Sequence, residues 1–220
     1  PLPQIDSKEF QKVLDTRRSV RVYKSDEIPE EIVKKCLENA LKAPTSSNLQ
    51  TWEIYWIRSN KKKKDLIDAC FSQPAAKTAK ELFVFVARPD HWERNNNMML
   101  DYINTRKDPP KSVLNYYGKI TKFAYNQGFL NYFGFFKKLM ISIIGLFRLI
   151  PREPTSFNDM KVWSQKTTAL ACQNFMLSMR AYGYDTCPME GLDSSRVKKI
   201  LKLPKKAQIC MAISAGKRDN

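Results

Sequence analysis

Residues 159–182 carry a helical pattern with almost no polar face, and this segment limits the possible folds most strongly. Its apolar side chains recur on most sides of the helix; they are Trp163, Leu170, Ala171, Phe175, Met176, Leu177 and Met179. Gly183 follows and favours a helix end, because glycine readily takes the left-handed conformation found there. A helix that is apolar around most of its circumference is covered by other elements. We therefore expect this helix at the centre of a domain or at a subunit interface.

The remaining chain alternates between helix and strand patterns. β-branched and aromatic runs predict three buried strands, at 53–57, 82–87 and 207–214. Capping residues and apolar spacing predict helices at 6–16, 29–43 and 193–203, and Lys61–Lys64 begin a solvent-facing one. Widely spaced strands with helices between them indicate an α+β fold.

The charge of the chain points to an anionic partner without identifying it. The 220 residues are 43% apolar, which suffices for a sizeable core in one domain. Lys and Arg number 38 against 22 Asp and Glu, and the net charge is +16. A surface of this charge attracts anions over several ångströms of solvent. Nucleic acid, an anionic bilayer, a phosphorylated cofactor and a solvated face without a specific partner all remain open.

Cysteine and histidine content excludes several kinds of site. The five cysteines have no Cys-x-x-Cys spacing; they are Cys36, Cys70, Cys172, Cys187 and Cys210. Reduced thiols in a cytoplasmic protein are the expectation, and the first residues show no cleavable signal pattern. His91 is the only histidine. A histidine-based triad and a multi-histidine metal site are therefore not expected, and we predict no metal.

An aromatic-rich stretch interrupts the regular alternation. Ten Tyr and Phe residues crowd 113–150, and 139–150 is almost entirely apolar. A membrane-spanning helix needs about 20 uninterrupted apolar residues, whereas Lys137 and Lys138 interrupt this run and Arg148 closes it. We interpret the stretch as an inserted excursion that covers a cleft or meets a partner subunit. Peripheral contact with a membrane through 129–150 is the alternative.

Three separated segments carry polar groups that packing does not require. Arg17–Arg21 reads Arg-Arg-Ser-Val-Arg, and paired guanidinium donors suit a phosphate monoester. Ala43–Trp52 contains Ser, Asn and Gln side chains, which can bind the polar edge of a planar heterocycle. Cys187–Asp193 contains Gly191, which permits close backbone approach to a ligand. Each segment alone is equally compatible with an ordinary surface loop.

Together the three segments resemble the nitroreductase family of FMN-dependent reductases. The second segment is similar to the family's Ala-Pro-Ser-Ser-x-Asn-x-Gln-Pro-Trp motif, and Gly183–Asp193 to its Gly-x-x-x-x-Pro-x-x-Gly-Phe-Asp motif. Order and spacing match over residues 7–58 and 158–218. The resemblance implies a three-layer α/β/α fold with a mixed, mostly antiparallel sheet flanked by helices. Residues 1–220 would form a single domain with an aromatic-rich helical insertion at about 92–152.

The resemblance also implies which residues bind the cofactor. Arg17, Arg18 and Ser19 would hold the FMN phosphate and ribityl chain, with Arg21 beside them, and Lys217 and Arg218 would add C-terminal phosphate contacts. Pro44, Ser46, Ser47 and Asn48 would contact the flavin across the subunit boundary of a homodimer. Pro188, Met189, Glu190 and Gly191 would line one ring face, with the N–H of Glu190 or Gly191 reaching flavin N5. Gln73 and Lys77 would contact the ring and its O2 atom.

The activity implied by the resemblance is hydride transfer from NADH or NADPH through flavin N5 to a nitroaromatic, quinone or similar small-molecule acceptor. Donor and acceptor would use one face in turn, so a ping-pong mechanism is expected. The flavin performs this chemistry, and no catalytic side chain is required. The chain contains no Gly-x-Gly-x-x-Gly, so a Rossmann nicotinamide site is not indicated. The alternative is a basic peripheral membrane or nucleic-acid-binding protein without catalysis; of the two, nucleic acid is not expected.

Overall fold

A four-stranded sheet forms the centre of the structure, a computed structural model that describes residues 3–219. The strands are β1 (Trp52–Trp56), β2 (Glu81–Ala87), β3 (Asp185–Met189) and β4 (Gln208–Gly216). Their order is β1-β2-β4-β3, and each neighbouring pair is antiparallel. One parallel bridge, between Ser19 and Thr186, adds the N-terminal segment to this sheet. The three predicted strands are confirmed with ends shifted by one or two residues.

β3 is the strand that the sequence patterns missed. It has five residues and contains Pro188, which lacks the backbone N–H that would donate to a neighbouring strand. The sheet order places β3 at an edge, where a proline is tolerated. The segment that follows the long helix is therefore part of the sheet as far as Met189, rather than a loop.

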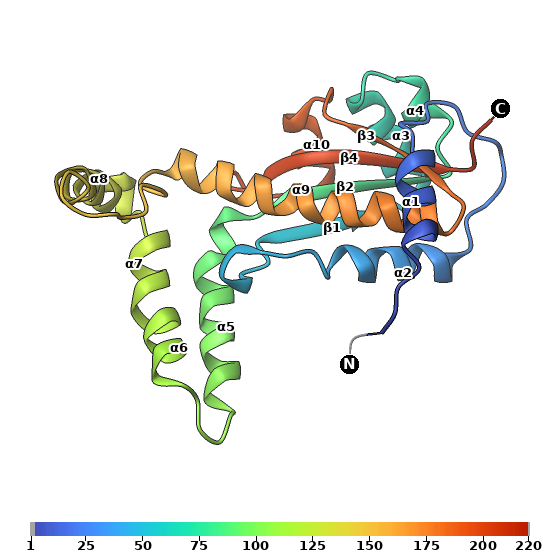
Figure 1. The fold of residues 1–220 in the computed structure, drawn as a ribbon. Coiled ribbons are helices and arrows are strands. Elements are labelled where there is room, and N and C mark those ends of the chain that lie inside the picture. The colour runs from blue at the N-terminus through green and yellow to red at the C-terminus, as the bar shows by residue number, and fades with distance from the viewer. Residues whose placement is uncertain (1–2, 220) are drawn as a thin grey trace.

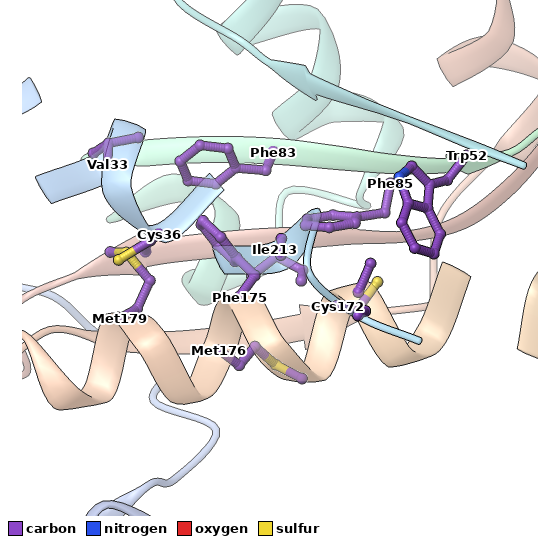
Figure 2. Packing of buried hydrophobic residues seen from close by; sticks show 14 of the residues in the cluster. Val33, Cys36, Trp52, Phe83, Phe85, Cys172, Phe175, Met176, Met179 and Ile213 are labelled. Carbon is purple, nitrogen blue, oxygen red and sulfur yellow. The ribbon is translucent and has the colours of Figure 1, made fainter. Parts of the chain in front are cut away.

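Helices α2 (Glu30–Ala40) and α9 (Phe157–Ala181) cover one face of the sheet. Their apolar side chains enclose a cluster in which Phe175 of α9 packs edge-on against Phe83 of β2, with ring centroids 4.7 Å apart (Figure 2). Phe83, Phe85 and Phe175 are completely buried. The central position predicted for the long apolar helix is thus confirmed.

The opposite face carries α3 (Asn60–Ala69) and α10 (Ser194–Leu201). These helices bury Leu66 and Val197 against side chains of β2 and β4. The three layers confirm the predicted α/β/α arrangement. Helix α1 (Ser7–Thr16) crosses α9 from outside and buries none of its residues, and the short α4 (Pro74–Lys77) precedes β2 (Figure 1).

Between β2 and α9 the chain makes a helical excursion that extends from one end of the body (Figure 1). Its elements are η2 (Pro89–His91), α5 (Trp92–Asn104), α6 (Lys111–Asn115), the π-helix η3 (Tyr116–Ile120), α7 (Thr121–Tyr125), η4 (Phe129–Asn131) and α8 (Tyr132–Ile144). Within 3–219, no helix combines the length and the apolar character that crossing a bilayer requires.

A buried polar contact stabilises the base of the excursion. The π-helical turn widens the backbone at Tyr117, whose carbonyl accepts from Asn96 Nδ2 at 2.9 Å and from Thr121 Oγ1 at 3.0 Å. Asn96 and Thr121 are fully or almost fully buried. In a regular α-helix Thr121 N would donate to Tyr117 O, but here it donates to Tyr116 O, so the two side chains supply donors to the Tyr117 carbonyl in the wide turn.

Arg88 joins the start of the excursion to the sheet edge, and His91 packs beside it. Arg88 donates to Glu53 Oε2 at 2.6 Å and to both carboxylate oxygens of Asp90. Arg94 Nη2 lies 3.0 Å from His91 Nδ1. A guanidinium only donates, so His91 Nδ1 accepts and the imidazole is neutral.

Acidification from pH 7 to pH 5.5 is expected to destabilise the protein through His91. Burial, followed by the charges of Arg88 and Arg94, lowers the pKa of His91 below 6.5, while Asp90 and Glu53 oppose this decrease. The unfolded chain then binds more protons than the native chain as the pH falls, so native stability decreases. Urea unfolding at the two pH values measures the effect. The pH dependence should be smaller in His91→Gln; an identical dependence would contradict the assignment.

Candidate active site

The basic N-terminal segment lies along the edge strand β3. Val20 N donates to Thr186 O at 3.2 Å, next to the Ser19–Thr186 bridge. Tyr23 anchors the segment further on: its hydroxyl lies 3.0 Å from Ser214 Oγ, and its ring covers Gly216 so closely that a Cβ there would approach it to 2.7 Å. The predicted phosphate-binding residues are therefore held beside β3 and β4.

Asp185 at the start of β3 organises a group of arginines. It is 2% exposed and accepts from Arg218 Nε at 2.7 Å, Arg218 Nη2 at 2.6 Å and Arg180 Nη1 at 3.2 Å. The two arginines also bind the last residue of α1: Arg218 donates to Thr16 O at 3.1 Å and Arg180 to Thr16 Oγ1 at 2.9 Å. In this arrangement the Arg218 guanidinium is engaged with a carboxylate.

Other cations near this edge lack such a partner. Within residues 3–219, Arg17, Arg21 and Lys77 form no ion pair, and Lys217 approaches Asp26 only to 3.8 Å. Burial raises the pKa of the Cys187 thiol on β3, and the nearby Arg21 charge opposes that increase. Positive charges that the protein itself does not neutralise make this edge a suitable binding site for an anion such as phosphate.

The chain just beyond β3 is exposed at Glu190 and Gly191. A Cβ added to Gly191 would meet nothing within 4 Å, so a ligand can approach the backbone closely. Gln73 Nε2 lies 3.4 Å from Gly191 O, which brings the turn before α4 to the same place. A cavity of about 540 Å³ runs along Glu190, Gln165 and Lys166.

Ser46, Ser47 and Asn48 form a second group that faces the excursion. Ser47 and Asn48 have positive φ values of 55° and 50°, a conformation that costs free energy for residues other than glycine. Tyrosine hydroxyls hold the segment: Tyr125 lies 2.9 Å from Ser46 Oγ, and Tyr116 lies 2.8 Å from Ser47 Oγ. These contacts stabilise a backbone shape that the local sequence does not favour.

In one chain the predicted site residues therefore form two groups. The first group comprises Arg17, Arg18, Ser19, Arg21, Gln73, Lys77, Pro188, Met189, Glu190, Gly191, Lys217 and Arg218. The second comprises Pro44, Ser46, Ser47 and Asn48. Lys166 of α9 borders both the cavity at Glu190 and a smaller one of about 290 Å³ at Pro44 and Ser46.

The residues at this edge fit FMN. Arg17 and Arg21, which form no ion pair within residues 3–219, suit a phosphate, and the open backbone at Gly191 suits a flat ring. Arg18 Nη1 donates to the carbonyls of Asp15 and Arg17, so it must turn outward to reach a ligand. The fit is therefore better for Arg17 and Arg21 than for Arg18 and Arg218.

Sequence patterns did not indicate the residues that support the second group. Tyr116, Tyr117 and Tyr125 belong to an aromatic stretch without a motif of its own, although Tyr117 also donates to Ser47 O at 3.0 Å. Lys166, which lines both cavities, is not among the predicted site residues either. A charged residue in the middle of an almost apolar helix was an available signal.

Comparison with known proteins agrees with the fold and identifies the family. A model of the nitroreductase family matches residues 14–217. An NADH dehydrogenase of Thermus thermophilus is 27% identical over 202 residues, which cover 91% of this chain and 82% of the relative. The ydfN protein of Bacillus subtilis has a structure with a TM-score of 0.77 at 20% identity, covering 97% of this chain and 90% of that one.

A protein of Exiguobacterium sibiricum, solved in complex with FMN, has a TM-score of 0.67 at 22% identity, covering 100% of this chain and 91% of that one. The structural matches support the same fold, and the family model spans nearly the whole chain. The family predicted from the three motifs is therefore confirmed: this chain belongs to the nitroreductase family.

Proposed function

We propose that this chain is an FMN-dependent NAD(P)H oxidoreductase whose flavin phosphate binds at the edge formed by Arg17, Arg21 and β3. The observation that carries the proposal is that the segment of Arg17 and Arg21 pairs with β3 at Thr186 and reaches the end of α4, where Tyr23 N donates to Thr78 Oγ1 next to Lys77. Within residues 3–219 none of these three cations forms an ion pair. Arg17, Arg18, Ser19 and Arg21 bind the phosphate and ribityl chain. Lys217 and Arg218 border the phosphate side.

The ring-side residues bind and orient the cofactor. When bound, FMN supplies hydride transfer at N5 between NADH or NADPH and an acceptor. The backbone N–H of Glu190 or Gly191 would donate towards N5, and Pro188 would lie against one ring face together with the backbone of Met189, whose side chain is 3% exposed. Lys77 and Gln73 face the ring's O2 side, where a positive charge stabilises the anionic reduced form electrostatically. No side chain acts as a nucleophile.

A homodimer completes the site in this proposal, because Pro44, Ser46, Ser47 and Asn48 of one subunit contact the flavin held by the other. Apolar side chains left exposed on α1 and α9 support such an interface: Phe10, Leu14, Val162 and Leu170 are 40–55% exposed. Residues 1–220 form a single domain with an insertion at about 92–152. The location is cytoplasmic and the acceptor is a nitroaromatic, quinone or similar small molecule.

Reconstitution and steady-state kinetics test the proposal. The protein loaded with FMN should be yellow, should oxidise NADH or NADPH, and should reduce nitroaromatics or quinones. Double-reciprocal plots at several acceptor concentrations should be parallel, as ping-pong kinetics require; intersecting lines would exclude that mechanism. A colourless protein that retains no FMN would overturn the whole proposal and favour a binding protein without catalysis.

The Tyr125→Phe substitution is expected to weaken FMN binding about fivefold, the scale of about 1 kcal/mol for a lost hydrogen bond. The hydroxyl holds Ser46 and Ser47, at 2.9 and 3.0 Å, whereas the ring packs on Trp163 and should stay in place. Flavin fluorescence titration measures the dissociation constant. Tyr102→Phe on α5 is the matched control. Equal affinities in Tyr125→Phe and the wild type would show that the tyrosine does not position the flavin segment.

A further inference from the structure

The far end of the excursion exposes an unusually large apolar surface, which we call the α8 surface. Helix α8 and its flanking turns leave twelve large apolar side chains exposed; they are Phe129, Leu130, Tyr132, Phe133, Phe135, Phe136, Leu139, Met140, Ile143, Leu146, Phe147 and Leu149. Phe147 is 82% exposed and Leu149 is fully exposed. Soluble surfaces rarely expose apolar side chains in one contiguous segment of this kind, and such patches mark interaction sites.

The chain orients α8 so that this surface stays free. Lys137 is 2% exposed, and its Nζ donates to three carbonyls at the end of α7: Ala124 O at 2.7 Å, Asn126 O at 3.0 Å and Phe123 O at 3.3 Å. Gly134 packs so tightly on Thr155 that a Cβ would have no room. Both contacts hold the inner side of α8 against α7 and the start of α9, and the aromatic side chains face outward.

The charge around the α8 surface is mostly positive, although Glu153 and Asp159 line a cavity together with Lys138. Residues 109–152 contain no Asp or Glu but seven Lys and Arg: Lys111, Lys119, Lys122, Lys137, Lys138, Arg148 and Arg152. Lys119, Lys122, Lys138 and Arg148 are exposed. An apolar surface with a basic surround complements an anionic lipid surface, where apolar side chains enter the acyl region and Lys and Arg meet the headgroups.

We propose that the α8 surface docks on an anionic phospholipid bilayer, with α8 lying in the plane of the interface. Helix α8 has 13 residues and is about 20 Å long, shorter than the hydrocarbon core, so it lies on the membrane rather than across it. Phe and Tyr are the side chains expected at this depth. A second copy of the same surface would bring two predominantly basic surrounds together, with Lys138 and Arg148 exposed on both, which disfavours symmetric self-association.

The α8 surface is connected to the candidate active site through α7. Lys137 holds the end of α7, and Tyr125 in that turn binds Ser46 and Ser47. Docking therefore places the second group of site residues near the membrane. The proposal concerns binding alone and does not depend on the flavin chemistry.

Vesicle co-sedimentation of the full chain loaded with FMN tests the proposal. Vesicles of phosphatidylcholine with about one third phosphatidylglycerol should sediment the protein, and phosphatidylcholine alone should sediment much less. High salt should reduce the binding without abolishing it, because only the electrostatic part is screened. Equal binding to both vesicle types, or none to either, would overturn the proposal.

Single substitutions test whether the α8 surface makes the contact with the vesicles. Phe147→Ser and Phe136→Ser should each weaken partitioning about tenfold, since each removes one aromatic side chain from the acyl region. Tyr102→Ser, an exposed aromatic on α5, is the matched control and should bind like the wild type. Retained flavin absorbance and an unchanged unfolding transition show that the variants are folded.

Size-exclusion chromatography with light scattering tests the competing partner of the α8 surface, which is a second copy of this chain. If Phe147→Ser changes the oligomeric state and leaves vesicle binding unaltered, the α8 surface covers a second copy and the proposal is wrong. If vesicle binding falls while the oligomeric state stays constant, the bilayer is the partner. Loss of NAD(P)H oxidation without loss of vesicle binding would contradict the proposed enzymatic function and leave the membrane proposal intact.

Discussion

The Asp185→Asn substitution is expected to lower the free energy of unfolding by about 3 kcal/mol, the lower end of the range for breaking a buried ion pair. Asp185 is almost completely buried, and it is the carboxylate that neutralises both Arg180 and Arg218. Removal of its charge leaves two guanidinium groups close together without compensation. The arginines are 24% and 37% exposed, so solvent reduces the loss.

The same substitution should also weaken FMN retention, because Arg180 and Arg218 hold Thr16, the residue before Arg17. Urea unfolding and flavin titration measure the two effects. Glu9→Gln on α1 is the control: this carboxylate is exposed and pairs with Lys12, so stability should change by less than about 1 kcal/mol. A stable Asp185→Asn variant would show that the network contributes little to the fold.

The Arg17→Ala substitution is expected to weaken FMN retention about thirtyfold, which corresponds to about 2 kcal/mol for a charge-assisted hydrogen bond to phosphate. Arg17 ends α1 and is half-buried, and its guanidinium has no ion-pair partner in the part of the chain that the structure describes. Stability should therefore change little. Arg17→Lys should retain part of the affinity, because it keeps the charge but loses the paired donors.

Lys12→Ala provides the matched control for Arg17→Ala. It removes one positive charge from the same helix at an exposed position, so it tests whether net charge alone attracts the cofactor. Equilibrium dialysis with FMN at two salt concentrations gives the dissociation constants. Equal losses in the two variants would indicate general electrostatic attraction, and unchanged affinity in Arg17→Ala would remove this residue from the phosphate site.

The proposed homodimer would combine the two groups of predicted site residues in one flavin site. The first group is joined by strand pairing and by the Asp185 network. The second is held by tyrosines of the excursion. In the proposed homodimer the excursion thus has a role in flavin binding.

Local patterns were enough to predict the elements that depend on neighbouring residues. Apolar spacing in 159–182, capping residues and β-branched runs depend on nearby positions, and they correctly predicted the central helix, three strands and the layered α+β fold. The ordered polar motifs predicted the family, because each motif is contiguous in the chain. Arg17, Ser46 and Glu190 could therefore be identified as candidates before any contact was known.

Features that depend on residues far apart in the chain could be seen only in the folded structure. β3 became visible only through its pairing with β4, since a five-residue segment with a proline has no clear strand pattern. Arg218 pairs with Asp185, which lies 33 residues earlier in the chain, because the fold brings the two residues together. The tyrosines that bind Ser46 and Ser47 lie 69 to 79 residues later in the chain. Side-chain hydrogen bonds act over about 3 Å, so folding alone determines which distant residues meet.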